Sequence, residues 1–322
     1  MYLTTRRGFV IGGAAAATML GLNRPVEFLV SASAQGAGAT FKSYKVGEIA
    51  MTSIYDGVID RPHDPAFVKN ASLDDVKASL KAGGISDASV PNPFVVPMAR
   101  IGGKTVLFDA GTGGQLAPTA GSLAANLTAA GRDPASVDVV LVSHFHPDHI
   151  FGLMAKDTNA PLFPKAEIVM PEVEYNWWTD AGVLAKLPPA RQGLAKRVQA
   201  VFPDWKSKGR IRLVGDNAEV VPGVRSIHAP GHTPGHMAWH VTSGASQLFV
   251  LADTVTYNPV FLRNPGWHAA FDADGALAEA NRRKLIERAI AEKAMVTAYH
   301  FIFPSAGTIA RDGNGYRFEP IA

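Results

Sequence analysis

The stretch that decides the fold covers residues 139 to 149 and reads Val139-Val140-Leu141-Val142-Ser143-His144-Phe145-His146-Pro147-Asp148-His149. Its apolar first part predicts a buried strand. Alternate side chains of an extended chain point to the same side, so His144 and His146 can share one metal ion. Beyond the proline a helix can begin, and it would direct Asp148 and His149 to a neighbouring point, where they can hold a second ion.

The density of these polar groups is the main evidence for metal. A single surface histidine is usually solvated and would indicate little by itself. Polar groups crowded beside an apolar strand are costly unless something satisfies them. The chain has no cysteine, and imidazole with carboxylate suits zinc, or manganese, cobalt or iron at a site richer in oxygen. We therefore expect two divalent ions, most simply zinc.

Length and composition indicate one large globular domain. The chain has 322 residues, of which 47% are apolar and 18% charged, and this balance excludes intrinsic disorder. The formal net charge is +3, and no stripe of lysine and arginine with interleaved aromatic residues is present. Nucleic acid is therefore not an expected partner.

The first residues resemble a twin-arginine signal peptide. Thr5-Arg6-Arg7-Gly8-Phe9-Val10 precedes an apolar Gly/Ala-rich stretch, and Ala32-Ser33-Ala34 offers a cleavage site. We expect a signal peptide over residues 1–34, one domain over residues 35–322, the twin-arginine export machinery as a partner, and a periplasmic or secreted location. The apolar stretch is too short for a stable membrane anchor.

The remaining sequence alternates β-rich and helical segments. Strands are expected within 41–54, 94–108 and 137–142, with helices at 73–80, capped by Ser72, and at 116–131. Residues 173–201 are expected to be mostly helical, followed by strands within 211–251, a long helix over 276–293 and a strand before residue 300. Two β-rich halves, each followed by helices, predict an α/β fold of four layers, an αββα sandwich with the site at the strand ends.

Three further candidate ligands follow expected strands. His232 lies in the stretch Gly231-His232-Thr233-Pro234-Gly235-His236, Asp253 follows the run 248–252, and His300 follows the run 296–299. In this order the motifs resemble the metallo-β-lactamase-fold hydrolases, most clearly from residue 94 to residue 317. The resemblance implies that His144, His146 and His232 hold one metal, that Asp148, His149 and His300 hold the other, and that Asp253 bridges them.

The resemblance also implies a function and supporting residues. Two such metals activate a bridging hydroxide for hydrolysis, and Asp148 could pass the proton to the leaving group. Asp109 resembles an aspartate that braces the metal loop from behind, although it could also cap a turn. His236 could support the ligands or simply stabilise the fold.

Among these hydrolases the chain is most similar to the methyl parathion hydrolase group and the N-acyl-homoserine lactonases. We expect a small, apolar, neutral lactone or carboxylic ester as substrate, with an organophosphate triester as the alternative and a non-catalytic exported metal-binding protein as a second one. Leu116 and Leu194 stand where the parathion group has phenylalanine, and Tyr257 stands one place after the tyrosine of the lactonases. A homodimer is expected from relatives. The predicted pocket residues are Phe94, Leu116, Trp177, Trp178, Leu194 and Tyr257.

Overall fold

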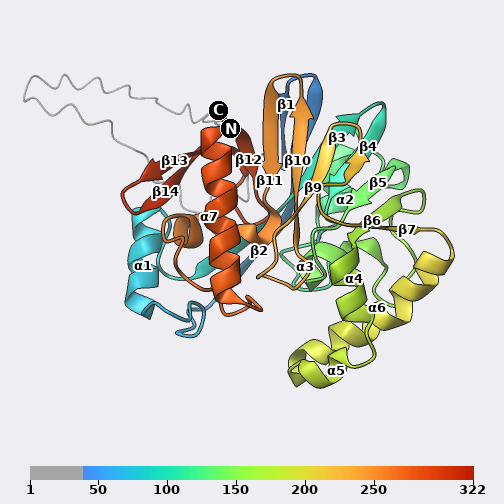
Figure 1. The fold of residues 1–322 in the computed structure, drawn as a ribbon, viewed down its shortest axis with the longest axis horizontal. Helices are drawn as coiled ribbons and strands as arrows, with labels where there is room; N and C mark the ends of the chain where they lie inside the picture. Colours follow the sequence, from blue (N-terminus) through green and yellow to red (C-terminus); the bar gives the residue numbers. More distant parts are fainter. Residues whose placement is uncertain (1–38) are drawn as a thin grey trace, which may run out of the picture.

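The computed structural model describes residues 39–322, so the predicted signal peptide, residues 1–34, lies outside the described residues. Two seven-stranded sheets form the centre of the described chain. Helices cover their outer faces, as Figure 1 shows. None of the helices in residues 39–322 has the length and apolar character needed to cross a bilayer.

The first sheet contains the strands of the first half in chain order, from β1 to β7. Neighbours from β1 to β4 are antiparallel, and those from β4 to β7 are parallel. The strands are β1 (Phe41–Val46), β2 (Ile49–Arg61), β3 (Val90–Ile101), β4 (Lys104–Phe108), β5 (Val139–Leu141), β6 (Glu167–Pro171) and β7 (Ile211–Val214).

The second sheet has the order β14-β13-β12-β11-β10-β9-β8, and only the β11–β12 pair in it is parallel. Its strands are β8 (Glu219–Val221), β9 (Val224–His228), β10 (Met237–Ser243), β11 (Ser246–Val250), β12 (Met295–Thr297), β13 (Ala306–Asp312) and β14 (Gly315–Pro320). The helices are α1 (Leu73–Ala82), α2 (Leu123–Ala129), α3 (Pro147–Ile150), α4 (Glu172–Thr179), α5 (Val183–Lys186), α6 (Pro189–Ser207) and α7 (Gly275–Ala291).

Strand β5 explains why the deciding stretch begins with consecutive apolar residues. Val139 and Leu141 belong to a core that includes Trp239 and Val250 of the opposite sheet. Val140 points the other way, into a core shared with residues of α2, α4 and α6. A central strand buried on both faces needs apolar residues at every position.

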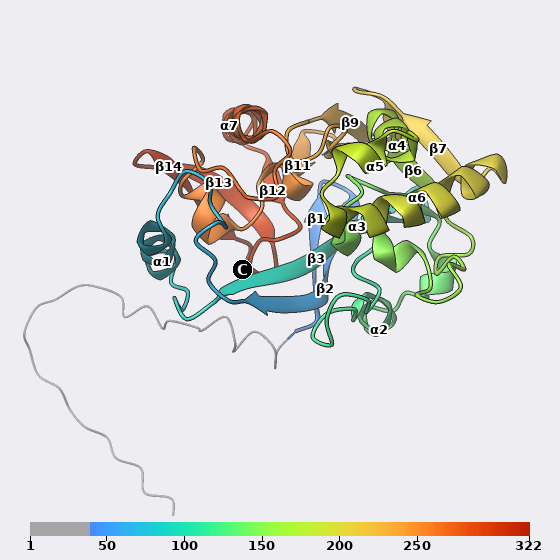
Figure 2. The ribbon, with the colours of Figure 1, turned by 90° about the horizontal axis from the view of Figure 1, so that it is seen from below.

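Helix α7 covers the other sheet. Leu285 and Ile286 pack in one apolar cluster with Phe249 and Val296. The layers are therefore helix, sheet, sheet and helix, and the predicted αββα sandwich is confirmed. Figure 2 shows α1 apart from these layers, beside β13 and β14.

The expected helix over residues 116–131 is wrong in its first half, because α2 begins only at Leu123. Asp56 accepts hydrogen bonds from the backbone at the start of α2. The N–H groups of Gly121 and Ser122 donate to its carbonyl oxygen, and the N–H of Leu123 donates to its Oδ1, all at 2.8–2.9 Å. Gly121 also has φ +120°, a conformation outside the helical region. The expected cap of α1 is confirmed, since Ser72 and Asp75 form a reciprocal capping box.

Candidate metal centre

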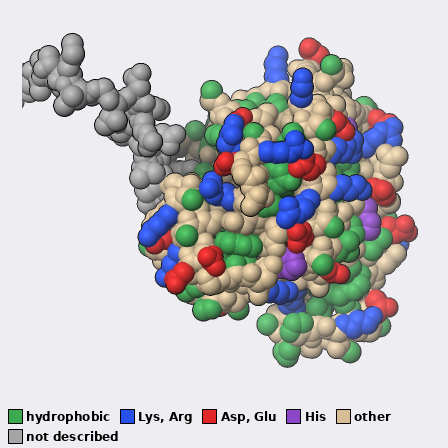
Figure 3. All heavy atoms as spheres, turned by 60° about the vertical axis from the view of Figure 1, so that its left-hand side comes forward, with side chains coloured by type: hydrophobic (Ala, Val, Ile, Leu, Met, Phe, Trp, Pro, Cys, Tyr) green, Lys and Arg blue, Asp and Glu red, His purple; other side chains and the backbone are tan. Residues whose placement is uncertain are grey.

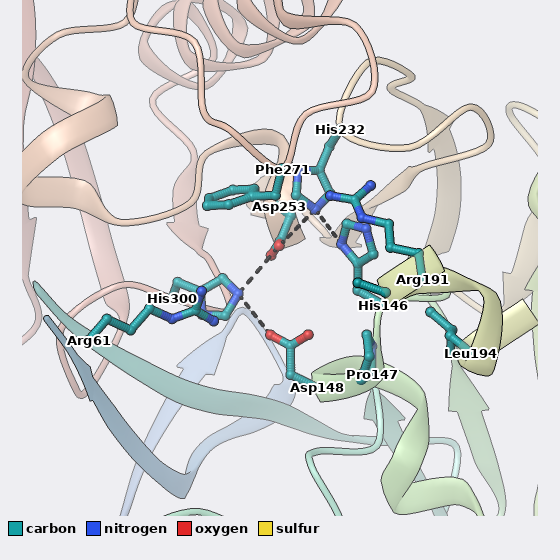
Figure 4. Close-up of a pocket in the computed structure, with 11 residues that line it drawn as sticks. Arg61, His146, Pro147, Asp148, Arg191, Leu194, His232, Asp253, Phe271 and His300 are labelled. Carbon is teal, nitrogen blue, oxygen red and sulfur yellow. Dashed lines mark hydrogen bonds and ion pairs between the residues drawn. The ribbon is translucent and has the colours of Figure 1, made fainter. Parts of the chain in front are cut away.

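Seven side chains from four separate loops converge at one edge of the two sheets. The loop after β5 and the start of α3 supply four of them, and the loops after β9, β11 and β12 supply one each. Figure 4 shows several of them at the floor of a pocket. The seven are the sequence-predicted residues His144, His146, Asp148, His149, His232, Asp253 and His300, in two groups.

The first group contains His144, His146, His232 and Asp253, with one ligand atom of each within 4.8 Å of the others. Nδ1 of His146 lies 3.0 Å from Nε2 of His144 and 2.9 Å from Nε2 of His232. Oδ2 of Asp253 lies 3.1 Å from Nε2 of His232. Ligand atoms that each sit about 2.0–2.1 Å from one shared ion have separations of this order.

The second group contains Asp148, His149 and His300, again within 4.8 Å. Oδ2 of Asp148 lies 3.3 Å from Nε2 of His300 and 3.7 Å from Nε2 of His149. Asp253 also reaches this group, with Oδ1 3.5 Å from Nε2 of His149 and Oδ2 3.3 Å from Nε2 of His300. Its carboxylate therefore faces both groups, as a bridging ligand would.

Two buried atoms support the fit of these groups to cations. Nε2 of His149 and Oδ1 of Asp253 have no hydrogen-bond partner among the described residues, although both atoms are shielded from solvent. Such atoms are costly to bury unless a ligand satisfies them. The donors are nitrogen and carboxylate oxygen, which suit divalent ions of the zinc class. The residues present therefore fit two divalent cations.

Hydrogen bonds behind the histidines fix which ring nitrogen faces the centre. Nδ1 of His149 donates to Asp109 at 2.8 Å, and Nδ1 of His232 donates to Asp272 at 2.9 Å. Nδ1 of His300 donates to the carbonyl of Pro93 at 2.9 Å. In each case Nε2 is left for a metal, and the partner holds the ring in orientation.

Asp109 and His236, the two predicted supporting residues, both lie behind the ligands. Asp109 also accepts hydrogen bonds from the backbone N–H and hydroxyl of Ser143 at 2.7 and 2.8 Å, so it holds the loop that carries His144. Nε2 of His236 accepts the backbone N–H of Asp253 at 3.1 Å, and its Nδ1 lies 3.1 Å from the carbonyl of Ala229. Both ring nitrogens of His236 are thus used within the fold.

Burial and mutual charge set the protonation of the cluster. Burial, with the neighbouring imidazoles, lowers the pKa of His144 and of His146 well below the usual range. Burial also acts to lower the pKa of His232 and of His300, but the carboxylate of Asp253 outweighs it and raises each pKa to about 9. A cation must displace the protons of those two rings when it binds.

The carboxylates behave in the opposite way. Burial acts to raise the pKa of Asp148 and of Asp253, but the facing histidines outweigh it and lower both pKa values. Both groups are therefore ionised at neutral pH, which is the state that ligates a cation.

Glu174 is a supporting residue that the sequence did not reveal. It lies on α4 and is fully buried. Oε1 accepts the backbone N–H of Phe145 at 3.0 Å and the indole N–H of Trp178 at 2.7 Å, and Oε2 accepts the backbone N–H of Gly235 at 2.9 Å. Phe145 stands between two ligands, and Gly235 belongs to the loop of His232. One carboxylate therefore joins two of the three loops that supply the first group, those of His144 and His232.

Other supporting residues also escaped the sequence analysis. Asp272, which orients His232, lies 3.7 Å from the buried guanidinium of Arg282. Arg282 donates to the backbone carbonyls of residues 254, 265 and 267. The hydroxyl of Tyr299 donates to the carbonyl of Asp148 at 2.6 Å. These partners come from distant segments, and no local sequence pattern indicates them.

A cavity of about 250 Å³ opens onto the cluster. Of the predicted pocket residues, Leu194 lines it. The side chains that line it are Arg61, His146, Pro147, Asp148, Ala190, Arg191, Leu194, His232, Asp253, Phe271 and His300. Arg61, Arg191 and Phe271 line the cavity although no sequence pattern predicted them.

The other five predicted pocket residues do not line this cavity, and the prediction is corrected for them. Trp178 is buried and gives its N–H to Glu174, and Trp177 packs beside it against the core. Phe94 is buried behind His300, with the ring centroids 5.5 Å apart.

Leu116 and Tyr257 lie elsewhere for different reasons. Leu116 is 39% exposed in the loop before α2. Tyr257 is buried in a separate apolar cluster with Leu80 and Phe261. Packing with distant segments therefore decides the position of Tyr257, whereas Leu116 stays partly exposed in its loop.

Comparison with known proteins supports the family that the sequence motifs resemble. The family described as the Metallo-beta-lactamase superfamily matches residues 94–300. An N-acyl homoserine lactonase of a Bacillus species is 27% identical over 177 residues, which cover 55% of this chain and 61% of that protein. One from Bacillus thuringiensis is 28% identical over 154 residues, 48% of this chain and 52% of that protein. The matches thus span less than two thirds of these relatives.

Two solved structures resemble the whole described fold. AidC, described as a dizinc quorum-quenching lactonase in complex with a product, has a TM-score of 0.81 and 24% identity, covering 88% of this chain and 97% of that one. AbOPH, described as a hydrolase of the beta lactamase superfamily, has a TM-score of 0.81 and 26% identity, covering 88% and 98%. With the family match over residues 94–300, the chain belongs to the metallo-beta-lactamase superfamily.

Proposed function

We propose that this protein is a metal-dependent hydrolase that opens a lactone or cleaves a carboxylic ester with two divalent cations, most simply zinc. The observation that carries the proposal is the convergence of seven ligating side chains at the floor of a cavity. A nitrogen and oxygen donor set without cysteine supports zinc, and the similar AidC is described as a dizinc enzyme.

Bound in these two groups, divalent cations make water nucleophilic near neutral pH and polarise the scissile carbonyl. The residues of the chain position and orient the ligating side chains and the group that transfers the proton. His236 holds the backbone of Asp253, so the carboxylate faces both groups. Asp148 lines the cavity and is ionised because the facing histidines lower its pKa. It can therefore accept a proton from the attacking water and pass this proton on to the leaving alkoxide.

Two observations support a lactone or ester over a phosphotriester. The relatives that match by sequence are named N-acyl homoserine lactonases. The apolar residues that line the cavity are Pro147, Ala190, Leu194 and Phe271, and no tryptophan is among its lining residues. An acyl group can pack against these side chains.

Export is also part of the proposal. The paired Arg6 and Arg7 and the Ala32-Ser33-Ala34 stretch support a signal peptide over residues 1–34, ahead of a hydrolase domain over residues 35–322. N-terminal sequencing of the protein recovered from the periplasm tests this directly. A chain that still begins at residue 1 would contradict it.

The function is tested by measuring how fast the metal-loaded protein hydrolyses three substrates, with and without chelator. The substrates are 4-nitrophenyl acetate, an N-acyl-homoserine lactone and methyl parathion. We expect the lactone or ester to be cleaved faster than the triester and chelator to abolish the reaction. Asp253→Asn should lose a bound ion and activity, while Asp204→Asn, at an exposed position on α6, should keep both. Two bound ions with no hydrolysis of any substrate would favour a metal-binding protein instead.

A further inference from the structure

We propose that the pocket takes an ester or lactone that carries a carboxylate, and that Arg61 and Arg191 bind this second charged group at the pocket mouth. The inference rests on the proposed function and specifies its substrate class. It replaces the expectation of an uncharged substrate.

The two arginines line the cavity from opposite sides of the metal cluster. Arg61 ends β2, and Arg191 lies in the first turn of α6. In Figure 4 the guanidinium of Arg61 lies beside His300, and that of Arg191 lies near His146 and His232. A molecule seated on the cluster would therefore be within reach of positive charge on both sides.

Neither guanidinium is neutralised by the described part of the protein. Most other arginines have a partner; Arg212, for example, pairs with Glu167 at 2.9 Å, and Arg283 pairs with Glu279 at 2.9 Å. The side chains of Arg61 and Arg191 make no hydrogen bond or ion pair with any residue in 39–322.

The acidic groups nearby do not compensate. Asp60 and Asp64 flank Arg61 in the chain, but both are exposed and neither forms an ion pair within the described residues. The first turn of α6 contains no acidic residue. The carboxylates at the pocket floor, Asp148 and Asp253, face the histidines instead. On the face drawn in Figure 3, acidic and basic side chains are interspersed.

A carboxylate is the ligand that this arrangement fits. A guanidinium presents donors in a planar fork that matches the two oxygens of a carboxylate. Arg191 is half-buried while Arg61 is exposed, so solvent screens the pair only in part. The apolar side chains of the pocket would then hold the part of the acyl group between the scissile bond and the charge.

A matched pair of esters tests the proposal. 4-Nitrophenyl butyrate and mono-4-nitrophenyl glutarate share a leaving group and differ by a terminal carboxylate. We expect kcat/KM of the metal-loaded protein to be higher for the glutarate ester, and the R61Q/R191Q double variant to lose roughly tenfold on that ester and little on the butyrate. Lys196→Gln removes a charge from an exposed position on the same helix and should change neither value.

The outcomes separate cleanly. Equal losses on both esters, or no loss on either, would overturn the proposal and indicate that the arginines contact an uncharged group or nothing. A preference for the glutarate ester that falls as sodium chloride is added would support it.

A binding measurement distinguishes failure of this inference from failure of the proposed function. If neither ester is cleaved, the hydrolase proposal fails, but calorimetric titration with butyrate and glutarate still tests the arginines. Each acid offers one carboxylate to the metal centre, and only glutarate offers a second. We expect tighter binding of glutarate in the wild type and equal binding of both acids in the double variant. Equal binding in the wild type would refute the role of the arginines.

Discussion

Replacing Glu174 by glutamine should loosen one metal group while sparing the other. The carboxylate of Glu174 accepts two N–H groups on Oε1 and one on Oε2. Glutamine keeps one acceptor oxygen and brings an NH₂ group, so one of the loop N–H groups then faces another donor. The first group of ligands depends on both loops that this side chain joins.

The size of the effect follows from the hydrogen bonds that the substitution removes. A hydrogen bond to a charged group contributes about 1.5–3 kcal/mol, and a buried N–H left without an acceptor costs about 1–3 kcal/mol. Burial raises the pKa of Glu174, which means that its charge is costly to bury, and the neutral amide recovers part of this cost. A net destabilisation of about 2–4 kcal/mol remains. Supporting residues of this kind typically change metal affinity by about 10- to 100-fold.

Stepwise chelator titration with elemental analysis measures the effect. We expect Glu174→Gln to lose one ion at a roughly 10- to 100-fold lower chelator concentration than the wild type does. The ion expected at Asp148, His149 and His300 should stay bound, because Glu174 contacts none of these residues. Glu172→Gln, an exposed position on the same helix, should behave as the wild type. Simultaneous loss of both ions, or unchanged titration in a folded variant, would refute this reasoning.

Three further predictions concern the same region. Asp272→Asn removes the carboxylate behind His232 and should weaken binding of one ion about 10- to 100-fold, and an unchanged metal titration would contradict it. Burial and the imidazole of His232 lower the pKa of His236 to about 3, so the folded chain keeps this ring neutral. The contribution of neutral His236 to the free energy of unfolding is therefore complete above about pH 6.5 and is lost as the pH falls toward 3. The urea midpoint at saturating metal should therefore drop further between pH 7 and pH 5 in the wild type than in His236→Gln; equal drops would exclude this role. In Gly235→Ala the new Cβ would lie 2.1 Å from the backbone nitrogen of Glu174, so thermal unfolding should show a loss of several kcal/mol, on the order of a strained core substitution, and an unchanged Tm would show that the loop can move.

The sequence predicted the parts of this protein that depend on local pattern. The run from Val139 to His149 contains both the strand and four of the ligands, so periodicity and composition sufficed there. The order of His232, Asp253 and His300 after apolar runs placed them at strand ends, where the structure has them. The family and the layer order followed from the same residues.

The parts that failed depend on packing between distant segments. Nothing local distinguishes Trp178, which turns into the core, from Leu194, which lines the cavity, because both lie on helices whose orientation is set by packing. Glu174 has the sequence of an ordinary solvated helix position, and its role follows from loops that reach it from residues 145 and 235. The predicted helix start at residue 116 is wrong because Asp56, which is distant in the sequence, accepts hydrogen bonds from the backbone N–H groups of Gly121 and Ser122.

The origin of the ligands has a mechanical consequence for the whole chain. His146 and His232 touch across 86 positions of sequence, one on the side of the first sheet and one on the side of the second. In a chain without cysteine, ions bound there would hold the two halves together at this edge, in addition to the hydrogen bonds between them, such as that from the backbone N–H of Met237 to the carbonyl of Ser143. They would stabilise the folded chain because they bind it and not the unfolded one. Removal of the ions should therefore make the interface between the two halves susceptible to proteases before either half unfolds.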